Sequence, residues 1–541
     1  MNSVLVNFVL KIFIALNNWY EHSLTHKVMK AIFGIFKTSV IWNFIAAERN
    51  YWNSRVLNFL SFKWLKPIFM FFDKLLKTSF LFKIALGVVE YSKTVILNST
   101  PIKLLFWFID SNSSDTFKAA TSILGLSSFV VFMSIVPHEF WSNFFILGGA
   151  ILLGSIFIFQ IFTEKIKFER EFITPSLVLF TFFAIISLFT GFGGGDSFRV
   201  GSIMFASIAI SIITTYTLNS IKKFRIFIGF ILIALVLTAL YGIFQFVTGI
   251  EIRLDFIDLE ANPDMAGRLF STMGNPNNYA KFITMFLPFI ATLFFIIKGT
   301  FKKLLLLAAL GLIIAALLLT LSRASYLAIA GSVGVFVLVL KPRLVPVALG
   351  IGLLSVPFWP DFIMARLSTL GTDSSSIFRM WIWEGSLRML EHYFITGVGM
   401  GPSAFRSIYL EYSHELAGSA MHSHNVFLNV WLELGIGGFL AIIAYNFSAI
   451  KKLIITFFGI SQKETIENEN TKQKVDKSNF ETSQAAELKL YIAAALSSIT
   501  AFLAFAMVEH VWFYPRTMLT YFIMMGMIFA LIRIEHLFKN C

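Results

Sequence analysis

Long apolar segments recur along this chain of 541 residues and restrict it to very few folds. A helix needs about 20 apolar residues to cross the ~30 Å hydrocarbon core of a bilayer. Twelve such runs can be read near residues 117–136, 141–162, 172–193, 198–218, 225–247, 277–297, 303–321, 324–340, 344–358, 425–448, 488–510 and 516–533. They lack the alternating pattern of barrel strands, and backbone in a bilayer must satisfy its own hydrogen bonds. We therefore expect an all-α polytopic membrane protein with about twelve transmembrane helices.

The composition supports membrane insertion and indicates which kinds of partner the chain can bind. Charged residues make up 14% of the chain, against about a quarter in soluble domains. The formal net charge of +13 raises the question of nucleic acid, but the basic residues lie beside the apolar runs. Anionic lipid headgroups are therefore the expected partner, and nucleic acid is not. The single cysteine, Cys541, allows no disulfide framework or cysteine metal site within the chain.

The short loops between the apolar runs predict the orientation, because cytoplasmic loops are enriched in Lys and Arg. If the spans alternate, the basic loops all fall on one side, at residues 163–171, 220–225, 298–303, 341–343, 451–464 and 533–540. The opposite loops then face outward, at residues 136–141, 191–197, 248–276, 321–323, 359–424 and 510–515. The largest of them, 359–424, lies between the ninth and tenth spans. We expect this loop to lie on the side of the membrane that faces away from the cytoplasm.

Two segments differ from the span-forming core, which we place at residues 115–535. Residues 1–105 are basic and interleave Trp, Phe and Lys in short apolar runs, which predicts amphipathic helices on the cytoplasmic membrane surface. The alternative is one or two further spans, such as 78–97. Residues 461–487 are highly polar, which predicts a disordered cytoplasmic loop.

The outward loops carry repeated arginines at span ends. Arg268 and Asn275 precede the sixth span, Arg323 lies between two spans, and Arg379 opens a helix-like stretch in the 359–424 loop. A single arginine at such a position is equally explained by snorkelling to lipid headgroups. Several arginines converging on one face suggest phosphate binding, because the guanidinium fork matches phosphate oxygens. We interpret them as a candidate diphosphate site.

A polar stripe opens the tenth predicted span. On a continuous helix, Asn425, Asn429 and Glu433 share one face and extend about 12 Å into the membrane. Glu433 either faces a cavity that binds substrate or pairs with a basic residue of another helix. Three following glycines are interpreted as sites of close helix packing, at Gly435, Gly437 and Gly438.

His424 stands at the mouth of this stripe. A neutral imidazole can take a proton from a sugar hydroxyl near neutral pH, which predicts a general base beside the diphosphate. The alternative is a histidine that only caps or packs the helix. Metal binding is a weaker interpretation, because His422 and His424 have no nearby acidic cluster. We expect His422 to point away from His424, as residues two apart at a helix start do.

These residues resemble the signature of the O-antigen ligase family, in which a His followed by Asn, Ser or Gln precedes nine residues and then Gly-x-x-Gly. Here His424 and Asn425 are followed by 426–434 and then by Gly435 to Gly438. The stretch "GNPN" at 274–277, the pair "SR" at 322–323, the long outer loop and the twelve spans are also similar to the family, over residues 115–535. The superfamily includes ligases, polymerases and transferases that modify proteins.

The resemblance implies a glycosyltransferase of GT-C-like fold that uses no metal or other cofactor. His424, Arg323 and Arg379 match the family's essential residues, and Arg268 matches as a third arginine. Asn275, Asn425 and Glu433 join Arg268 as expected substrate-binding residues. The donor would be a polyprenyl diphosphate-linked glycan, and the acceptor a hydroxyl of a glycan, lipid or protein. Residues 1–105 have no counterpart in the family pattern, and nothing identifies the acceptor.

The leading functional hypothesis is ligation of a glycan to an acceptor hydroxyl, with inversion at the anomeric carbon, in cell-surface polysaccharide assembly. A polymerase can share the donor, the arginines and the histidine, so it stays an alternative. A lipid-linked sugar transporter or flippase is the alternative from another class. A transporter would place its polar residues near the bilayer midplane, whereas here they gather at the ends of spans.

Overall fold

Helices form almost all of the described chain in this computed structural model. The structure describes residues 115–162, 166, 168–169, 172–249, 267–368, 374–470 and 476–540. No strand occurs in these ranges. The longer helices are α8 (Asp115–Ile135), α9 (Phe144–Phe162), α10 (Pro175–Thr190), α11 (Gly195–Thr217), α12 (Ile221–Thr248), α13 (Pro276–Ile296), α14 (Thr300–Leu319), α15 (Arg323–Leu340), α16 (Val345–Ser355), α17 (Asp361–Ser368), α18 (Ser374–Tyr393), α19 (Pro402–Tyr409), α20 (Val426–Asn470), α21 (Asp476–Ala506) and α22 (Pro515–Asn540). Short 3₁₀ turns join some of them, at η3 (His138–Phe140), η7 (Ser271–Met273), η8 (Pro342–Leu344), η9 (Val356–Phe358) and η10 (Glu415–Ala417).

Many of these helices are long and apolar enough to cross a membrane. Within the described ranges, nine meet this criterion: α9, α11, α12, α13, α14, α15, α20, α21 and α22. Three shorter apolar segments, 122–135, 175–190 and 342–358, coincide with the remaining predicted runs. The chain is therefore a multi-pass membrane protein, as predicted. The exact number of twelve spans stays a prediction.

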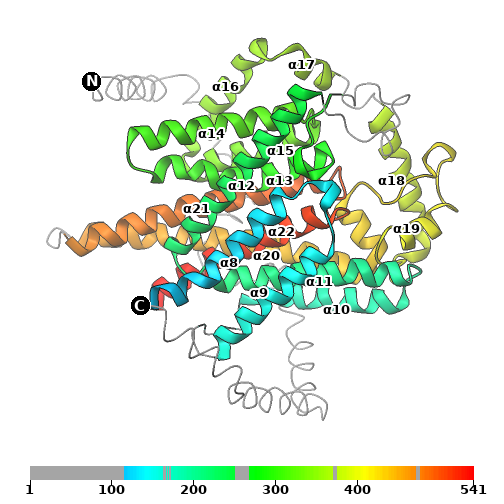
Figure 1. Cartoon of the computed structure of the whole chain (residues 1–541), viewed down its shortest axis with the longest axis horizontal. Helices are drawn as coiled ribbons and strands as arrows, with labels where there is room; N and C mark the ends of the chain where they lie inside the picture. The colour runs from blue at the N-terminus through cyan, green and yellow to red at the C-terminus, as the bar shows by residue number, and fades with distance from the viewer. Residues whose placement is uncertain are drawn as a thin grey trace, which may run out of the picture. The chain divides into compact units, whose positions relative to one another are not determined.

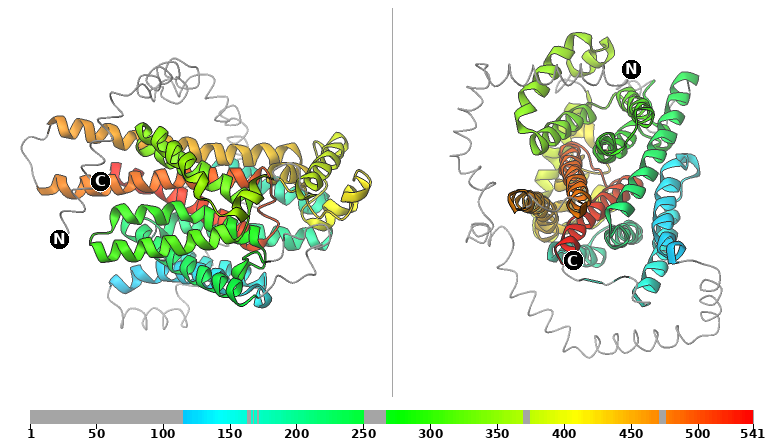
Figure 2. Two further views of the ribbon diagram at one scale, coloured as in Figure 1. Left: turned by 90° about the horizontal axis from the view of Figure 1, so that it is seen from above. Right: turned by 90° about the vertical axis from the view of Figure 1, so that its left-hand side faces the viewer.

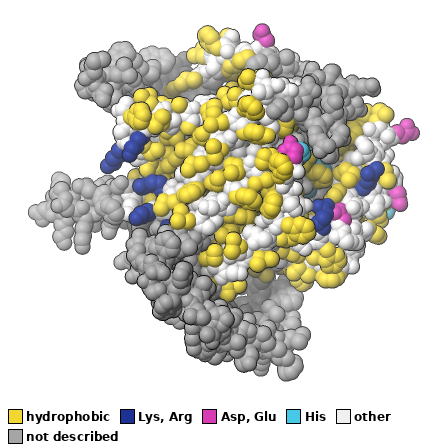
Figure 3. Space-filling model, viewed as in Figure 1, with side chains coloured by type: hydrophobic (Ala, Val, Ile, Leu, Met, Phe, Trp, Pro, Cys, Tyr) yellow, Lys and Arg dark blue, Asp and Glu magenta, His cyan; other side chains and the backbone are white. Residues whose placement is uncertain are grey.

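Helix α22 forms the centre of the bundle. Its apolar window is entirely buried, and it packs against α11, α13, α20 and α21. Figure 1 shows these helices running across one another, with α8 and α9 beside α11 and α12. The visible outer surface is largely apolar between more polar ends (Figure 3). Such a surface suits contact with lipid tails rather than water.

Four helices begin, and two others end, at the same end of the bundle. Helices α13, α15, α20 and α22 begin there, and α14 and α21 end there, as contacts between their termini show. The guanidinium Nε of Arg268 donates to the carbonyl of Thr320 after α14, at 2.8 Å. The amide Nδ2 of Asn425 donates to the carbonyl of Met507 after α21, at 2.9 Å. We call this the site end; Figure 2 shows α18 and α19 beside it.

The segment 359–424 is folded rather than irregular. It contains α17, α18, α19 and η10, and the last three enclose a small apolar core of their own with the start of α20. Ile382, Phe405, Tyr409 and Leu432 are members of this core, and each is almost fully buried. Helix α18, which carries Arg379, is thereby anchored at the site end.

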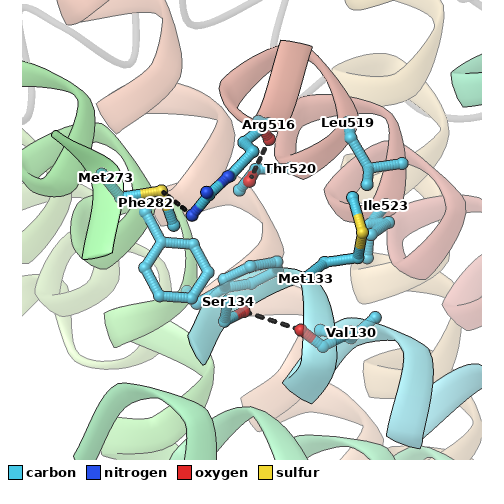
Figure 4. Close-up of a pocket in the computed structure, with 10 residues that line it drawn as sticks. Val130, Met133, Ser134, Met273, Phe282, Arg516, Leu519, Thr520 and Ile523 are labelled. Atoms are coloured by element: carbon cyan, nitrogen blue, oxygen red, sulfur yellow. Dashed lines mark hydrogen bonds between the residues drawn. The ribbon is translucent and has the colours of Figure 1, made fainter. Parts of the chain in front are cut away.

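Arg516, at the start of α22, contacts three other segments near this end. Its Nη1 donates to the carbonyls of Val136 and Thr272, at 2.8 and 2.9 Å, and its guanidinium lies 3.9 Å from the ring centroid of Trp141. A cavity of about 20 Å³ opens beside the guanidinium, lined partly by Phe282 (Figure 4). This volume accommodates about one water molecule, so the cavity is too small for a sugar substrate.

Helix α20 is broken where a continuous helix was expected. Gly435 has φ +66° and ψ −174°, so the helix from Val426 ends there and a second helix begins. A Cβ at Gly435 would lie 1.9 Å from the carbonyl oxygen of Ile395. Gly435 is therefore needed for a left-handed turn and a close backbone approach, which corrects its interpretation as simple helix packing. Gly437 does lie at a tight contact, with Phe183 of α10.

Two predicted segments cannot be compared fully with the structure. The predicted amphipathic region, residues 1–105, lies outside the described residues. In the predicted polar loop 461–487, the backbone is helical up to Asn470 and again from Asp476, with 471–475 outside the described residues. Glu, Lys and Gln are good helix formers in water, so a polar segment can continue a helix. The disorder and the side of this segment stay predictions.

Candidate active site

Glu509 joins side chains from four parts of the chain at the site end. It follows α21, and its Oε1 lies 2.5 Å from Nη2 of Arg379 on α18. Its Oε2 lies 3.5 Å from Nζ of Lys281 on α13 and 3.8 Å from Nδ1 of His424, two residues before α20. The amide Nδ2 of Asn277 also donates to Oε1, at 3.3 Å. Two predicted site residues, Arg379 and His424, therefore lie next to the same carboxylate.

Arg268 is connected to the same carboxylate through one residue. Its Nη2 donates to Oδ1 of Asn277 at 3.0 Å, and its side chain is almost fully buried. We call the joined side chains the Glu509 network: Arg268, Asn277, Lys281, Arg379, His424 and Glu509. The structure thus joins Arg268, Arg379 and His424 in one set of contacts, and their roles stay predictions.

Exposure changes across the Glu509 network. The side chains of Lys281 and Glu509 are 2% and 8% exposed, whereas those of Arg379 and His424 are 21% and 25% exposed. Burial alone would raise the pKa of Glu509, but the charges of Lys281 and Arg379 hold it well below its usual range. Glu509 is therefore an anion. A substrate would reach Arg379 and His424 before the buried pair.

Arg323 begins α15 directly after a strained turn. Leu321 has φ +51°, and its backbone N–H donates to the Leu318 carbonyl, at 3.1 Å. Arg268 donates to the carbonyl of Thr320 in the same turn. Arg323 is half-buried, and the turn places it at the site end with the Glu509 network.

Asn275 is a helix cap. Its Oδ1 accepts from the backbone N–H groups of Asn277 and Asn278, at 2.9 and 3.4 Å, and Pro276 occupies the first helical position. This is a strong helix start, because both features satisfy or remove the free N–H groups of the first turn. The side chain thereby fixes the direction of α13, which carries Lys281.

Asn425 also caps its helix. Its Oδ1 accepts from the backbone N–H of Leu428, at 3.0 Å, while its Nδ2 donates to Met507. It therefore lies before α20 rather than on the face of a continuous helix. Both ends of its amide have intramolecular partners.

Glu433 contacts a glycine loop. Its Oε1 accepts from the backbone N–H of Gly401, at 3.0 Å, and its own carbonyl accepts from Ser187 and Gly399. Among the described residues, none of these contacts involves a basic side chain, in contrast to the expected alternative of a pair with arginine or lysine. Within the described residues, Glu433 acts to hold the 397–401 loop against α20.

Ring contacts surround His422, the histidine beside His424. The ring of His422 lies 4.2 Å from that of His424, 5.4 Å from that of His510 and 4.3 Å from that of Phe513, between centroids. The prediction that His422 points away from His424 was wrong. The reason is that α20 begins at Val426, and His424 itself has φ +49°, so helical side-chain directions do not apply here.

His510 is held neutral. The backbone N–H of Ser423 donates to Oδ1 of Asn429, which directs Nδ2 of Asn429 toward Nε2 of His510, at 3.2 Å. Nε2 must therefore accept, and the proton lies on Nδ1. Burial and the nearby charge of Lys281 lower the pKa of His510 to about 3.

Lys281 and Glu509 were missed by the sequence interpretation. Both are ionisable residues close to the end of an apolar run, and they have opposite charges. An intramembrane charge is costly unless paired, so such a pair is a signal for a functional site. Pairing them required knowing that the start of α13 meets the end of α21. Within the described ranges, no group of three or more His, Asp or Glu side chains is arranged to hold a metal ion.

The comparison with protein families matches residues 306–443 to one family, described as O-antigen ligase. A comparison with curated proteins found no match. The matched segment includes Arg323, Arg379 and His424, whereas Lys281 and Glu509 lie outside it. The match confirms the resemblance inferred from the His-Asn and Gly-x-x-Gly pattern. Residues 306–443 of the chain are thus similar to the O-antigen ligase family.

Proposed function

We propose that this protein transfers a glycan from a polyprenyl diphosphate-linked donor to an acceptor hydroxyl at the outer face of the bacterial cytoplasmic membrane. The observation that carries the proposal is the joining of Arg379 and His424 on the Glu509 carboxylate. A phosphate-binding group and a proton acceptor lie there within one set of contacts. Group transfer from a diphosphate to an alcohol needs both.

The charge of the Glu509 network suits an anionic leaving group. Its three basic side chains and one carboxylate leave two net positive charges. The Nε–H of Arg379 is buried and has no hydrogen-bond partner among the described residues, although Nη2 is engaged. The guanidinium can therefore donate to a phosphate oxygen while it stays attached to Glu509.

His424 acts as the general base in this proposal. Its Nδ1 is buried and faces Oε2 of Glu509, which favours a proton on Nδ1 and leaves the lone pair on Nε2. The distance of 3.8 Å is long for a hydrogen bond, but catalytic contacts commonly shorten when substrate binds. Glu509 would then also stabilise the imidazolium that forms.

The reaction has a simple balance of bonds and protons. The acceptor oxygen forms a bond to the anomeric carbon as the bond from that carbon to the diphosphate oxygen breaks. The hydroxyl proton passes to Nε2 of His424, and the electron pair leaves with the polyprenyl diphosphate. Arg379 neutralises the charge that develops on the leaving group. One displacement of this kind inverts the anomeric configuration, and no metal takes part.

A polymerase would use the same donor and the same groups, with a growing glycan as the acceptor. The choice of ligation rests on the matched family description and the complete His-Asn signature. A flippase is less well supported. His424, Glu509 and Arg268 lie outside the apolar helices, beyond their ends, rather than at a midplane between two inverted halves.

The direct test uses purified protein in lipid nanodiscs with a polyprenyl diphosphate-linked oligosaccharide. Glycan, lipid A core and peptide acceptors are supplied separately. We expect release of free polyprenyl diphosphate together with an increase in the mass of one acceptor by the whole donor glycan. Growth of the glycan on its own lipid carrier would identify a polymerase instead. Movement of intact donor across proteoliposome membranes, with no release of diphosphate lipid, would contradict the proposal and identify a transporter.

A further inference from the structure

The turn before α20 is held by a side chain that the proposed mechanism does not use. The Nδ1 atom of His422 accepts a hydrogen bond from the backbone N–H of His424, at 3.1 Å. A side chain that accepts from the N–H two residues later forms the same contact as an Asx-turn, in which Asn or Asp normally supplies the acceptor. His422 therefore builds at this position a turn that another residue type usually builds.

This turn places His424 in an uncommon backbone conformation. Its φ of +49° lies in the left-handed region, which side chains other than glycine enter at an energetic cost. Strained conformations of this kind persist only where surrounding contacts maintain them. The contact from His422 is one that acts directly on the backbone of His424. Loss of that contact would let the turn relax and move the His424 ring.

The ring of His422 is itself held firmly. It packs against Phe513 and His510, which follow α21, as well as against His424. Burial lowers the pKa of His422 well below its usual value, and the neighbouring His424 and His510 lower it further. His422 therefore stays neutral, its proton lies on Nε2, and Nδ1 remains an acceptor. The segment after α21 thereby supports both Glu509 and the turn that carries His424.

We propose that His422 is a positioning residue that fixes the left-handed turn at His424, and so aims the His424 imidazole between Glu509 and the acceptor hydroxyl. The inference rests on the proposed function, in which His424 is the base. His422 takes no part in proton transfer, because Nδ1, its only acceptor atom, already accepts a hydrogen bond from the backbone N–H of His424. Its loss should slow the chemical step and leave donor binding unchanged.

The test compares two substitutions at one position. In His422→Asn, Oδ1 occupies the same place along the side chain as Nδ1 of histidine, so the turn is kept without an imidazole. In His422→Leu, a side chain of similar bulk has no acceptor. We expect His422→Leu to lower kcat by about 10- to 100-fold, since a misplacement of ~1 Å can cost about 10²-fold. We expect His422→Asn to retain most of the wild-type kcat, and both variants to retain the donor KM.

The measurement is glycan transfer at saturating acceptor, per amount of folded protein determined by size-exclusion chromatography. If His422→Leu yields no folded protein, His422→Gln replaces it, because its acceptor lies one carbon farther out and the same loss is expected. A wild-type kcat in His422→Leu, or in His422→Gln where it replaces that variant, would overturn the inference. A kcat of His422→Asn no higher than that of the same variant would also overturn it. Absence of transfer by the wild-type protein would instead refute the proposed function, so the two failures are distinguishable.

Discussion

Glu509 sets the charge of the site because it is an anion with cations on several sides. Its carboxylate is 8% exposed and contacts Lys281, which is 2% exposed. A buried ion pair contributes little net stability, but removal of one partner leaves an uncompensated charge in a medium of low polarity. Loss of either Lys281 or Glu509 alone should therefore lower the stability of the folded protein more than loss of both.

Glu509→Gln should destabilise the protein by roughly 3–5 kcal/mol, because Lys281 would lose its carboxylate. Addition of Lys281→Met should recover much of that loss, since the fully buried charge of Lys281 is then removed as well. Glu384→Gln is the matched control, because Glu384 is 56% exposed and pairs with Arg388 on the surface. Its effect should stay within about 1 kcal/mol. Free energies of unfolding in mixed micelles would measure these differences, and equal effects at the two positions would contradict the assignment.

The same pair predicts the direction of a pH effect. The folded-state pKa of Glu509 is depressed below the unfolded value of about 4.3. Its contribution to stability is therefore fully present above pH ~4.3 and is lost as the pH falls through the lower, folded-state pKa. The free energy of unfolding of wild-type protein should thus decrease more steeply on acidification than that of the double variant.

Arg379→Lys should lower kcat/KM by about 10-fold or more, because lysine keeps the charge but loses the planar fork that binds Glu509 and a phosphate oxygen together. Arg388→Lys is a matched control on the same helix, where the side chain is 54% exposed and paired with Glu384. Donor turnover, normalised to folded protein, separates the two. Full activity of Arg379→Lys would favour an arginine that only contacts lipid headgroups.

The sequence singled out part of the Glu509 network, for a physical reason. Positive charge is sparse in outward loops and His424 opens a polar stripe, so Arg268, Arg379 and His424 stood out individually. Their partners did not, because Lys281 and Glu509 meet only when α13 packs beside α21. The contact between His422 and His424 depends on a left-handed residue, which no helical periodicity can indicate. Roles in substrate binding remain predictions for the polar residues that cap helices or hold loops.

At the scale of elements, the break in α20 at Gly435 is the place where the loop after α18 packs against this helix. The loop that ends α18 approaches this break closely, because a Cβ at Gly397 would lie 2.6 Å from the backbone nitrogen of Gly435. Apolar runs predicted the helices well, since burial in lipid demands them. They could not predict the break, because a Gly-x-Gly-Gly pattern fits both close helix packing and a left-handed turn.

Gly435→Ala should destabilise the protein by about 1–3 kcal/mol from backbone strain alone, because φ is +66° there. The added Cβ would also meet the Ile395 carbonyl. Gly334→Ala in α15 is the control, since no atom lies within 4 Å of the added methyl group and its φ is not positive. Thermal stability in detergent measures both. Equal melting temperatures for the two variants would show that the break is not required.

At the scale of the whole molecule, orientation is the main prediction still to be tested. It rests on basic residues in the loops opposite to the site end. Ser407, on α19, and Thr300, at the start of α14, are both exposed and lie on opposite sides in this topology. Single cysteines at these positions, in a Cys541→Ser background, should react differently with a membrane-impermeant thiol reagent on intact cells. Ser407→Cys should be labelled and Thr300→Cys should not; the reverse pattern would invert the topology.

The central claim is that His424 is the base that activates the acceptor hydroxyl beside the Glu509 network. The most direct measurement is the rate of glycan transfer by His424→Gln at saturating acceptor, with donor binding measured in parallel. Glutamine keeps hydrogen-bonding capacity but cannot accept a proton near neutral pH. We predict a loss of turnover of about 10²–10⁴-fold with donor affinity nearly unchanged. A rate close to that of the wild-type protein would contradict the account and remove His424 from the chemistry.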